Sequence, residues 1–167
     1  YAGTDPGTLK RVRRTSDGGC LVAGALESAS DRFDAWLMKL DAMGAVMWEK
    51  RFVSGGAEVF NDAAEVGGGF GAAGYSGGGP LVVRFDGDGA VIWQRSYGGG
   101  GYAQALHPLA DGSLAVAGGV PGTAWSDGFD GWLLLLAADG TIRWQRRYGG
   151  PTDDRIAAIA PDGAGGF

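Results

Sequence analysis

Two similar acidic segments contain the residues of this chain that could do chemistry. SDRFDAW (30–36) and WSDGFDGW (125–132) each carry two aspartates three residues apart, and a tryptophan follows the second. Together with acids from neighbouring loops, they would form an acidic rim that holds a hard cation such as Ca²⁺ or supplies paired carboxylates for glycoside hydrolysis. The alternative is that Asp34 and Asp130 cap turns through hydrogen bonds to the backbone. The candidate ligand-binding acids are Asp34, Asp62, Asp130 and Asp154.

Two other features are candidates for binding. Trp125 and Phe129 lie in an irregular loop, VPGTAWSDGFDG (120–131), where an aromatic ring could stack on a sugar or a partner side chain, or simply anchor the loop. The segment LKRVRR (9–14) is a local basic patch that either contacts an anion or forms a solvated strand face. Its cations are Lys10, Arg11, Arg13 and Arg14.

Other kinds of chemistry have little support in the composition. The net charge of −5 and the pI of about 4.7 argue against nucleic-acid binding. One cysteine and one histidine are too few for a metal site built from nitrogen and sulfur ligands, so we expect no cofactor, with Ca²⁺ the only candidate ion. His107 has an apolar setting typical of a structural histidine, and no segment resembles a nucleophile elbow. No apolar stretch is long enough to span a membrane.

A repeated phrase predicts the elements that must position these residues. KLDAMGAVMWEKRF (39–52), RFDGDGAVIWQRSY (84–97) and LLAADGTIRWQRRY (135–148) each place a glycine four residues before a tryptophan. The tryptophans recur at steps of 45 and 51 residues, a period typical of stacked or radial repeats. The repeated structural residues are Gly44, Gly89, Gly140, Trp48, Trp93 and Trp144.

Each repeat contains four strand signals separated by glycine-containing turns. The third strand is apolar on both faces and the fourth alternates apolar with charged residues, as expected for an inner and an outer strand. Four antiparallel strands repeated in this way predict an all-β fold of β-propeller blades, with a β-sandwich or flat meander as the alternative. The expected blades are 1–51, 52–96, 97–147 and a partial 148–167, which gives about three and a half blades in a single domain, 1–167.

The repeats resemble a bacterial and archaeal surface-protein family. The matching phrases are DGGCLVAG (17–24), DAWLMKLDAMG (34–44), DGWLLLLAADG (130–140) and WQRRYGG (144–150), and the resemblance covers essentially the whole chain. It implies β-propeller blades in secreted or surface-attached proteins whose individual activities are usually unknown. The repeats are also distantly similar to quinoprotein dehydrogenase propellers, which implies that the repeated tryptophans pack between blades. No constellation for the quinone is present.

Three and a half blades are too few to close a ring, because propellers usually have four to eight. We therefore expect either a longer chain, which we favour, or self-association that completes the propeller. The leading prediction is a non-catalytic binding or scaffolding module at the cell surface, outside the cell or in the periplasm, with a protein or a glycan as partner. The alternatives are a glycan-active hydrolase or lyase that uses the acidic rim, and an accessory subunit docked through its open blade edges.

Overall fold

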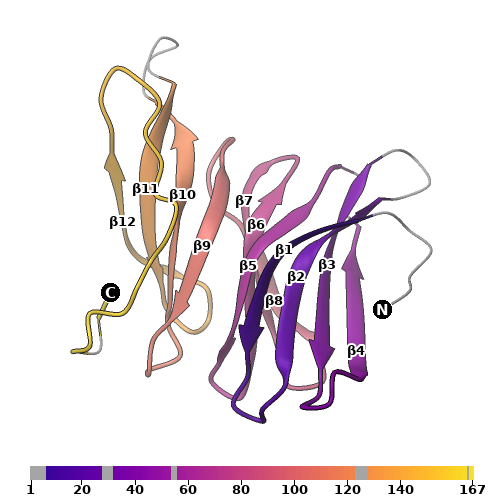
Figure 1. The fold of residues 1–167 in the computed structure, drawn as a ribbon. Coiled ribbons are helices and arrows are strands. Elements are labelled where there is room, and N and C mark those ends of the chain that lie inside the picture. Colours follow the sequence, from indigo (N-terminus) through magenta and orange to yellow (C-terminus); the bar gives the residue numbers. More distant parts are fainter. Residues whose placement is uncertain (1–6, 28–31, 54–55, 123–127, 165) are drawn as a thin grey trace.

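A computed structural model describes residues 7–27, 32–53, 56–122, 128–164 and 166–167 (Figure 1). The described residues form three four-stranded antiparallel sheets and no helix. The first sheet has the order β1-β2-β3-β4, the second β5-β6-β7-β8 and the third β9-β10-β11-β12. The strands are β1 (Gly7–Arg14), β2 (Cys20–Glu27), β3 (Phe33–Leu40), β4 (Val46–Phe52), β5 (Val59–Val66), β6 (Gly69–Ser76), β7 (Gly79–Phe85), β8 (Val91–Ser96), β9 (Tyr102–Pro108), β10 (Leu114–Pro121), β11 (Phe129–Leu136) and β12 (Ile142–Tyr148).

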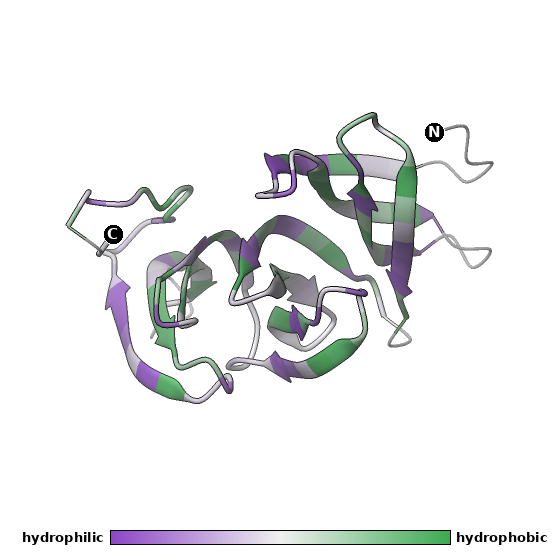
Figure 2. Ribbon diagram, turned by 90° about the horizontal axis from the view of Figure 1, so that it is seen from below, coloured by the Kyte–Doolittle hydropathy of each residue, from purple (hydrophilic) through white to green (hydrophobic). Residues whose placement is uncertain are grey.

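Burial differs between the strands as the repeat pattern predicts. The middle strands are almost fully buried, and β7 is buried at every position. The fourth strands β4, β8 and β12 are mostly exposed. Figure 2 shows hydrophobic and hydrophilic residues following one another along the strands. The two central strands of each sheet therefore supply most of the core, and β11 of the third sheet is half-buried at four of its eight positions.

A β-bulge occurs at the same place in the first strand of every sheet. One residue has no partner in the register with the second strand, namely Lys10, Asn61 and Gln104 in turn. The facing residue of the second strand is always a glycine, because the bulge brings the two backbones together. A Cβ on Gly24, Gly74 or Gly118 would lie about 2 Å from a carbonyl oxygen of the first strand (2.1, 1.8 and 2.0 Å). The repeated Ala-Gly of the sequence is thus a packing requirement of the bulge.

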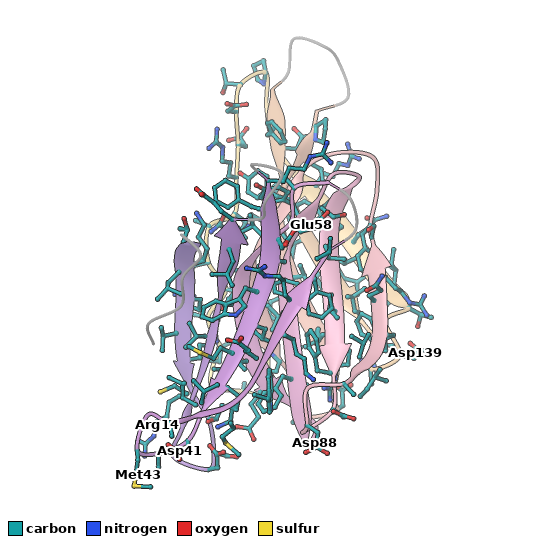
Figure 3. All side chains as sticks on the ribbon, turned by 90° about the vertical axis from the view of Figure 1, so that its right-hand side faces the viewer. Arg14, Asp41, Met43, Glu58, Asp88 and Asp139 are labelled. Carbon is teal, nitrogen blue, oxygen red and sulfur yellow. The ribbon has the colours of Figure 1, made fainter. Side chains whose placement is uncertain are left out.

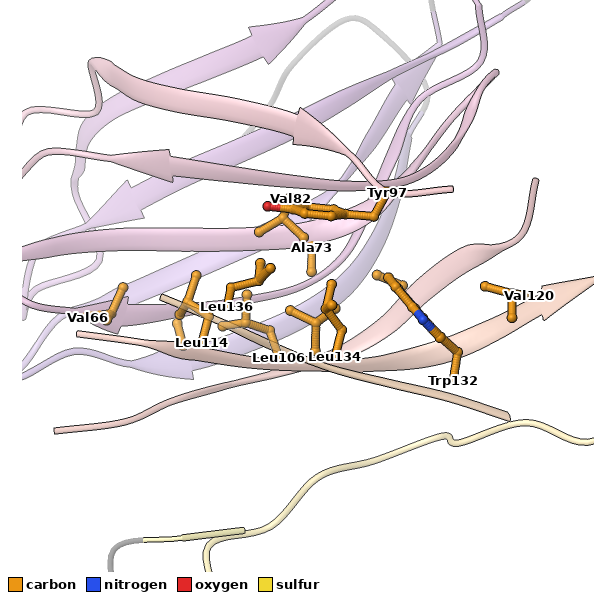
Figure 4. Packing of buried hydrophobic residues seen from close by; sticks show 13 residues of the cluster. Val66, Ala73, Val82, Tyr97, Leu106, Leu114, Val120, Trp132, Leu134 and Leu136 are labelled. Atoms are coloured by element: carbon orange, nitrogen blue, oxygen red, sulfur yellow. The ribbon is translucent and has the colours of Figure 1, made fainter. Parts of the chain in front are cut away.

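Adjacent sheets pack face to face. One apolar cluster, which includes Phe60, Phe85 and Leu37, joins the first and second sheets. Another, drawn in Figure 4, joins the second and third sheets and includes Leu106 and Trp132. The first strands lie next to one another, since β5 contacts both β1 and β9. The sheets therefore form a consecutive array in which each sheet buries one face against the next.

The residues after β12 differ from the sequence prediction. The pattern RIAAIA predicts a strand over 155–160, but the structure has no strand there. Among the described residues, no strand forms a ladder with this segment. The segment instead bonds to the third sheet, where the Ile156 N–H donates to the Gly118 carbonyl and the Asp154 N–H donates to the Phe129 carbonyl. The Glu58 N–H makes the matching bond to Phe33, at the start of the second repeat.

Figure 3 shows that the two ends of the sheets differ. Asp41 and Asp88, in turns that join third and fourth strands, lie at the lower end, Asp139 lies higher, and Glu58 lies above all three. The Asp41 carboxylate accepts hydrogen bonds from the N–H groups of Met43 and Ala45, and Asp86 repeats this arrangement in the second sheet. Asp41 and Asp86 therefore stabilise the turns between the third and fourth strands of their sheets.

A third turn aspartate gives a testable pH dependence. Asp111 accepts hydrogen bonds from the Ser113 hydroxyl and N–H, and from Arg143, and these lower its pKa from about 3.8 to about 2. A lowered folded-state pKa contributes stability that is present above pH 4 and is lost as the pH falls toward 2. We expect the melting temperature of the parent to exceed that of Asp111→Asn by a constant amount from pH 7 to pH 5. This difference should shrink between pH 4 and pH 2, and a constant difference across that range would contradict the assignment.

Candidate functional site

The structure brings two of the predicted groups together in one ion-pair network around a buried carboxylate. The Asp62 carboxylate is fully buried at the centre of the array. Arg13 donates to both of its oxygens, at 3.0 and 2.6 Å, and the Arg11 guanidinium lies 3.2 Å away. The backbone N–H groups of Ala63 and Leu106 complete its shell, both at 2.9 Å. Asp62 therefore links the first strands of all three sheets, and its oxygens already have protein donors.

Lys10 and Arg14, the other two cations of the basic patch, are exposed, and the Arg11 side chain is itself 42 % exposed. Lys10 is the bulged residue of β1, and Arg14 ends that strand (Figure 3). Arg13 also donates to the Leu106 carbonyl at 3.0 Å, which adds a second link between β1 and β9. The two arginines of the patch that contact Asp62 thus join the sheets.

The remaining acids of the predicted rim lie on different elements: Asp34 on β3, Asp130 on β11 and Asp154 in the segment after β12. Asp34 is buried, with Arg51 at 3.9 Å. Asp154 accepts a hydrogen bond from the Gly150 N–H at 2.9 Å, which closes a local turn. Neighbouring Asp153 accepts one from the Phe129 N–H at 2.8 Å, and this bond is the main cause of the lowered pKa of Asp153. Among the described residues there is no group of three or more His, Cys, Asp or Glu placed to hold a metal ion.

The aromatic candidates of the long loop are only partly placed. Trp125, with Asp31 and Asp127, lies outside the described residues. Phe129 begins β11, is half-buried and packs against Tyr102, with ring centroids 5.9 Å apart. Its ring therefore anchors the start of β11 to β9.

The repeated tryptophans form joints between successive sheets. The Trp48 indole N–H donates to the Gly87 carbonyl at 3.3 Å, and the Trp93 indole N–H donates to the Ala138 carbonyl at 3.0 Å. Each ring lies so close to the next turn that a Cβ on Gly89 or Gly140 would come within 3.0 to 3.1 Å of it. The glycine and the tryptophan of the phrase thus meet across sheets, the tryptophan of one sheet with the glycine of the next.

An aromatic residue at the end of the fourth strand, or directly after it, reinforces each joint. Phe52 packs edge-to-face on Phe60 and Phe85, both at 5.2 Å between ring centroids. Tyr97 is buried between the second and third sheets, and its hydroxyl donates to the Gly140 carbonyl at 2.8 Å. Burial raises the pKa of Tyr97 to about 12, so this donor is retained at any ordinary pH.

Within the described residues, the contact between a tryptophan and the next turn is not repeated at the two ends of the array. Gly44, on the turn of the first sheet, has nothing within 4 Å of its Cβ position. At the other end Trp144 is half-buried and stacks on Phe167, with centroids 6.1 Å apart, and Tyr148 is 53 % exposed. The first sheet presents an open acceptor turn, and the third sheet presents a tryptophan and a tyrosine.

A pocket of about 360 Å³ opens at the joint between the second and third sheets. We call it the inter-sheet pocket. One wall is the glycine linker 98–100, the floor is formed by buried side chains, and the other wall belongs to β12. The floor is Tyr97, Val120 and Trp132, and the β12 side chains are Ile142, Gln145 and Arg147.

Sequence reasoning missed this pocket. Its β12 residues belong to the repeated phrase, which predicts packing, and its glycines look like a simple linker. One signal was available, namely a difference between the repeats: the second repeat has Ser96 at the position that Arg147 occupies in the third. Steric limits require glycine in the linker, because Gly100 has a φ of 97° and would place a Cβ 3.1 Å from Pro121.

Comparison with protein-family models and with curated proteins finds no match to this sequence. The described residues contain no helix long and apolar enough to cross a membrane.

Proposed function

We propose that the chain is a non-catalytic β-propeller module of a secreted or cell-surface protein, which binds and scaffolds partners. The observation that carries this proposal is the repeated joint between sheets. Two tryptophans make the same contact with the following turn, so the sheets stack as successive blades with their first strands innermost. The extracellular location rests on the resemblance of the repeats.

The open halves of the joint define where a partner binds. Trp144 and Tyr148 occupy the positions that Trp93 and Tyr97 occupy at the internal joint, and Gly44 corresponds to Gly140. The open turn of one copy therefore fits the tryptophan face of another, with Phe167 displaced from Trp144. A second copy of this chain is the partner we propose.

Sedimentation of the purified chain over a range of concentrations tests this proposal. We expect concentration-dependent association, and we expect Trp144→Ala to weaken it by about tenfold or more, as for an interfacial tryptophan. Ile92→Ala is the matched control, because Ile92 is an exposed apolar residue at the bulge of β8, away from both open faces.

A strictly monomeric chain, or equal weakening by the two variants, would contradict the docking proposal. Hydrolysis of a glycan panel that is abolished by changing Asp34 or Asp130 would contradict the non-catalytic assignment.

A further inference from the structure

We propose that the inter-sheet pocket binds a monosaccharide-sized carboxylate, such as a uronic acid, with the carboxylate on the Arg147 guanidinium. The volume of about 360 Å³ lies within the range of small-ligand sites. This binding is separate from the docking of a second copy, because the pocket lies at an internal joint and not on an open face.

The charge of the pocket favours an anion. The whole chain carries 19 acidic and 14 basic side chains, yet Arg147 is the single charged residue of the lining. Its guanidinium donates to the Pro121 carbonyl at 3.1 Å, and no carboxylate of the described residues forms an ion pair with it. In the first sheet the corresponding Arg51 lies 3.9 Å from Asp34. Arg147 is therefore held by a neutral acceptor and keeps donors for a ligand.

Gln145 adds a donor with a defined orientation. Its Oε1 accepts the indole N–H of Trp132 at 3.1 Å, and because that indole can only donate, the amide cannot be reversed. The amide nitrogen of Gln145 is thus left for a ligand. Gly98 and Gly99 line the opposite wall, and their N–H groups find no protein acceptor within the described part of the chain.

The chemistry of these groups selects a carboxylate among anions. The planar guanidinium matches the two oxygens of a carboxylate. A phosphate carries up to two charges at neutral pH, and one arginine with neutral neighbours would leave much of that charge unmatched. The apolar floor of Tyr97, Val120 and Trp132 suits the carbon face of a sugar ring, while the linker and Gln145 face its hydroxyl groups.

Calorimetric titration of the chain with galacturonate, galactose and inorganic sulfate tests this inference. We expect galacturonate to saturate one site with a Kd on the order of 1 mM, in line with the efficiency of small ligands. Galactose, which lacks the carboxylate, should bind at least about tenfold more weakly, because the charged hydrogen bonds are lost. Sulfate should also bind more weakly than galacturonate.

Variants of β12 assign the site. Arg147→Ala should weaken galacturonate binding by about tenfold to a hundredfold. Arg147→Lys keeps the positive charge but lacks the planar guanidinium with its paired donors. Its affinity for galacturonate should lie between those of the parent and the alanine variant. The matched control is Arg146→Ala, because Arg146 is the adjacent residue of β12, with the same charge and on the opposite face of the strand, and it should leave the affinity unchanged.

Several results would overturn the inference. These are equal affinity for galactose and galacturonate, tighter binding of sulfate, an equal loss in Arg146→Ala, or no saturation at ten times the expected Kd. Circular dichroism checks the fold of each variant, and Arg147→Lys decides the question if the alanine variant does not fold.

Discussion

Replacing Asp62 by alanine is expected to lower the free energy of unfolding by about 3 kcal/mol, near the lower end of the range for breaking a buried ion pair. Asp62 is fully buried, whereas the side chains of Arg11 and Arg13 are 42 % and 31 % exposed. Water can therefore partly solvate the two cations after Asp62 is removed. The variant also leaves the N–H groups of Ala63 and Leu106 without their acceptor. Chemical denaturation followed by circular dichroism measures the effect.

The control for Asp62 removes the same charge from the surface. Asp88 is exposed and lies in the turn between β7 and β8, and Asp88→Ala should change the stability by less than about 0.5 kcal/mol. In a double-mutant cycle with Arg13→Ala, the losses should be far from additive, because the two residues share one interaction. Additive losses, or an effect of Asp62→Ala no larger than that of the control, would show that the network does not join the sheets.

A methyl group added at Gly118 is expected to destabilise the protein by about 4 kcal/mol or more, which is a large part of the stability of an ordinary domain. Its Cβ would lie 2.0 Å from the Tyr102 carbonyl oxygen and 3.0 Å from the Ala103 Cα, both backbone atoms of β9. A side chain could turn aside, but these atoms can move only if the bulge opens and β9 separates from β10. Thermal denaturation and soluble yield measure the loss.

The same substitution at an open glycine provides the comparison. Gly78 lies in the turn between β6 and β7, is exposed, and has nothing within 4 Å of its Cβ position. Gly78→Ala should therefore be neutral or slightly stabilising, because alanine reduces the freedom of the unfolded chain. If Gly118→Ala were as stable as Gly78→Ala, the requirement for glycine at the bulge would be refuted.

Local sequence signals predicted most of the fold. The all-β class, the four strands of each sheet and the exposed fourth strands follow from turn glycines and from alternating apolar residues, which act over a few residues. The segment 155–160 carried the same signal and yet forms no strand. A strand also depends on a neighbour to which it can bond, and a pattern within one segment does not contain that information.

The candidate site was harder to predict, because it depends on residues far apart in the chain. Arg13 and Asp62 are separated by 49 positions, so the basic patch and one rim acid looked like independent surface features. The pocket combines a glycine linker with three strands, and Gln145 and Arg147 gain their setting only when the linker lies against Pro121. The repeated glycines and tryptophans were recognisable because the two residues that contact each other between sheets recur together in every repeat.

The joint between sheets also has a direction. Tryptophan always contributes from the fourth strand of one sheet, and glycine always contributes from the turn of the next. In a closed ring of two copies, a two-fold axis along the ring axis brings the tryptophan face of each copy onto the turn of the other, so the two faces that meet are different. Assembly through this contact is therefore heterologous, and its outcome depends on the rotation between successive copies: a rotation that closes gives a ring, and one that does not gives a helical filament.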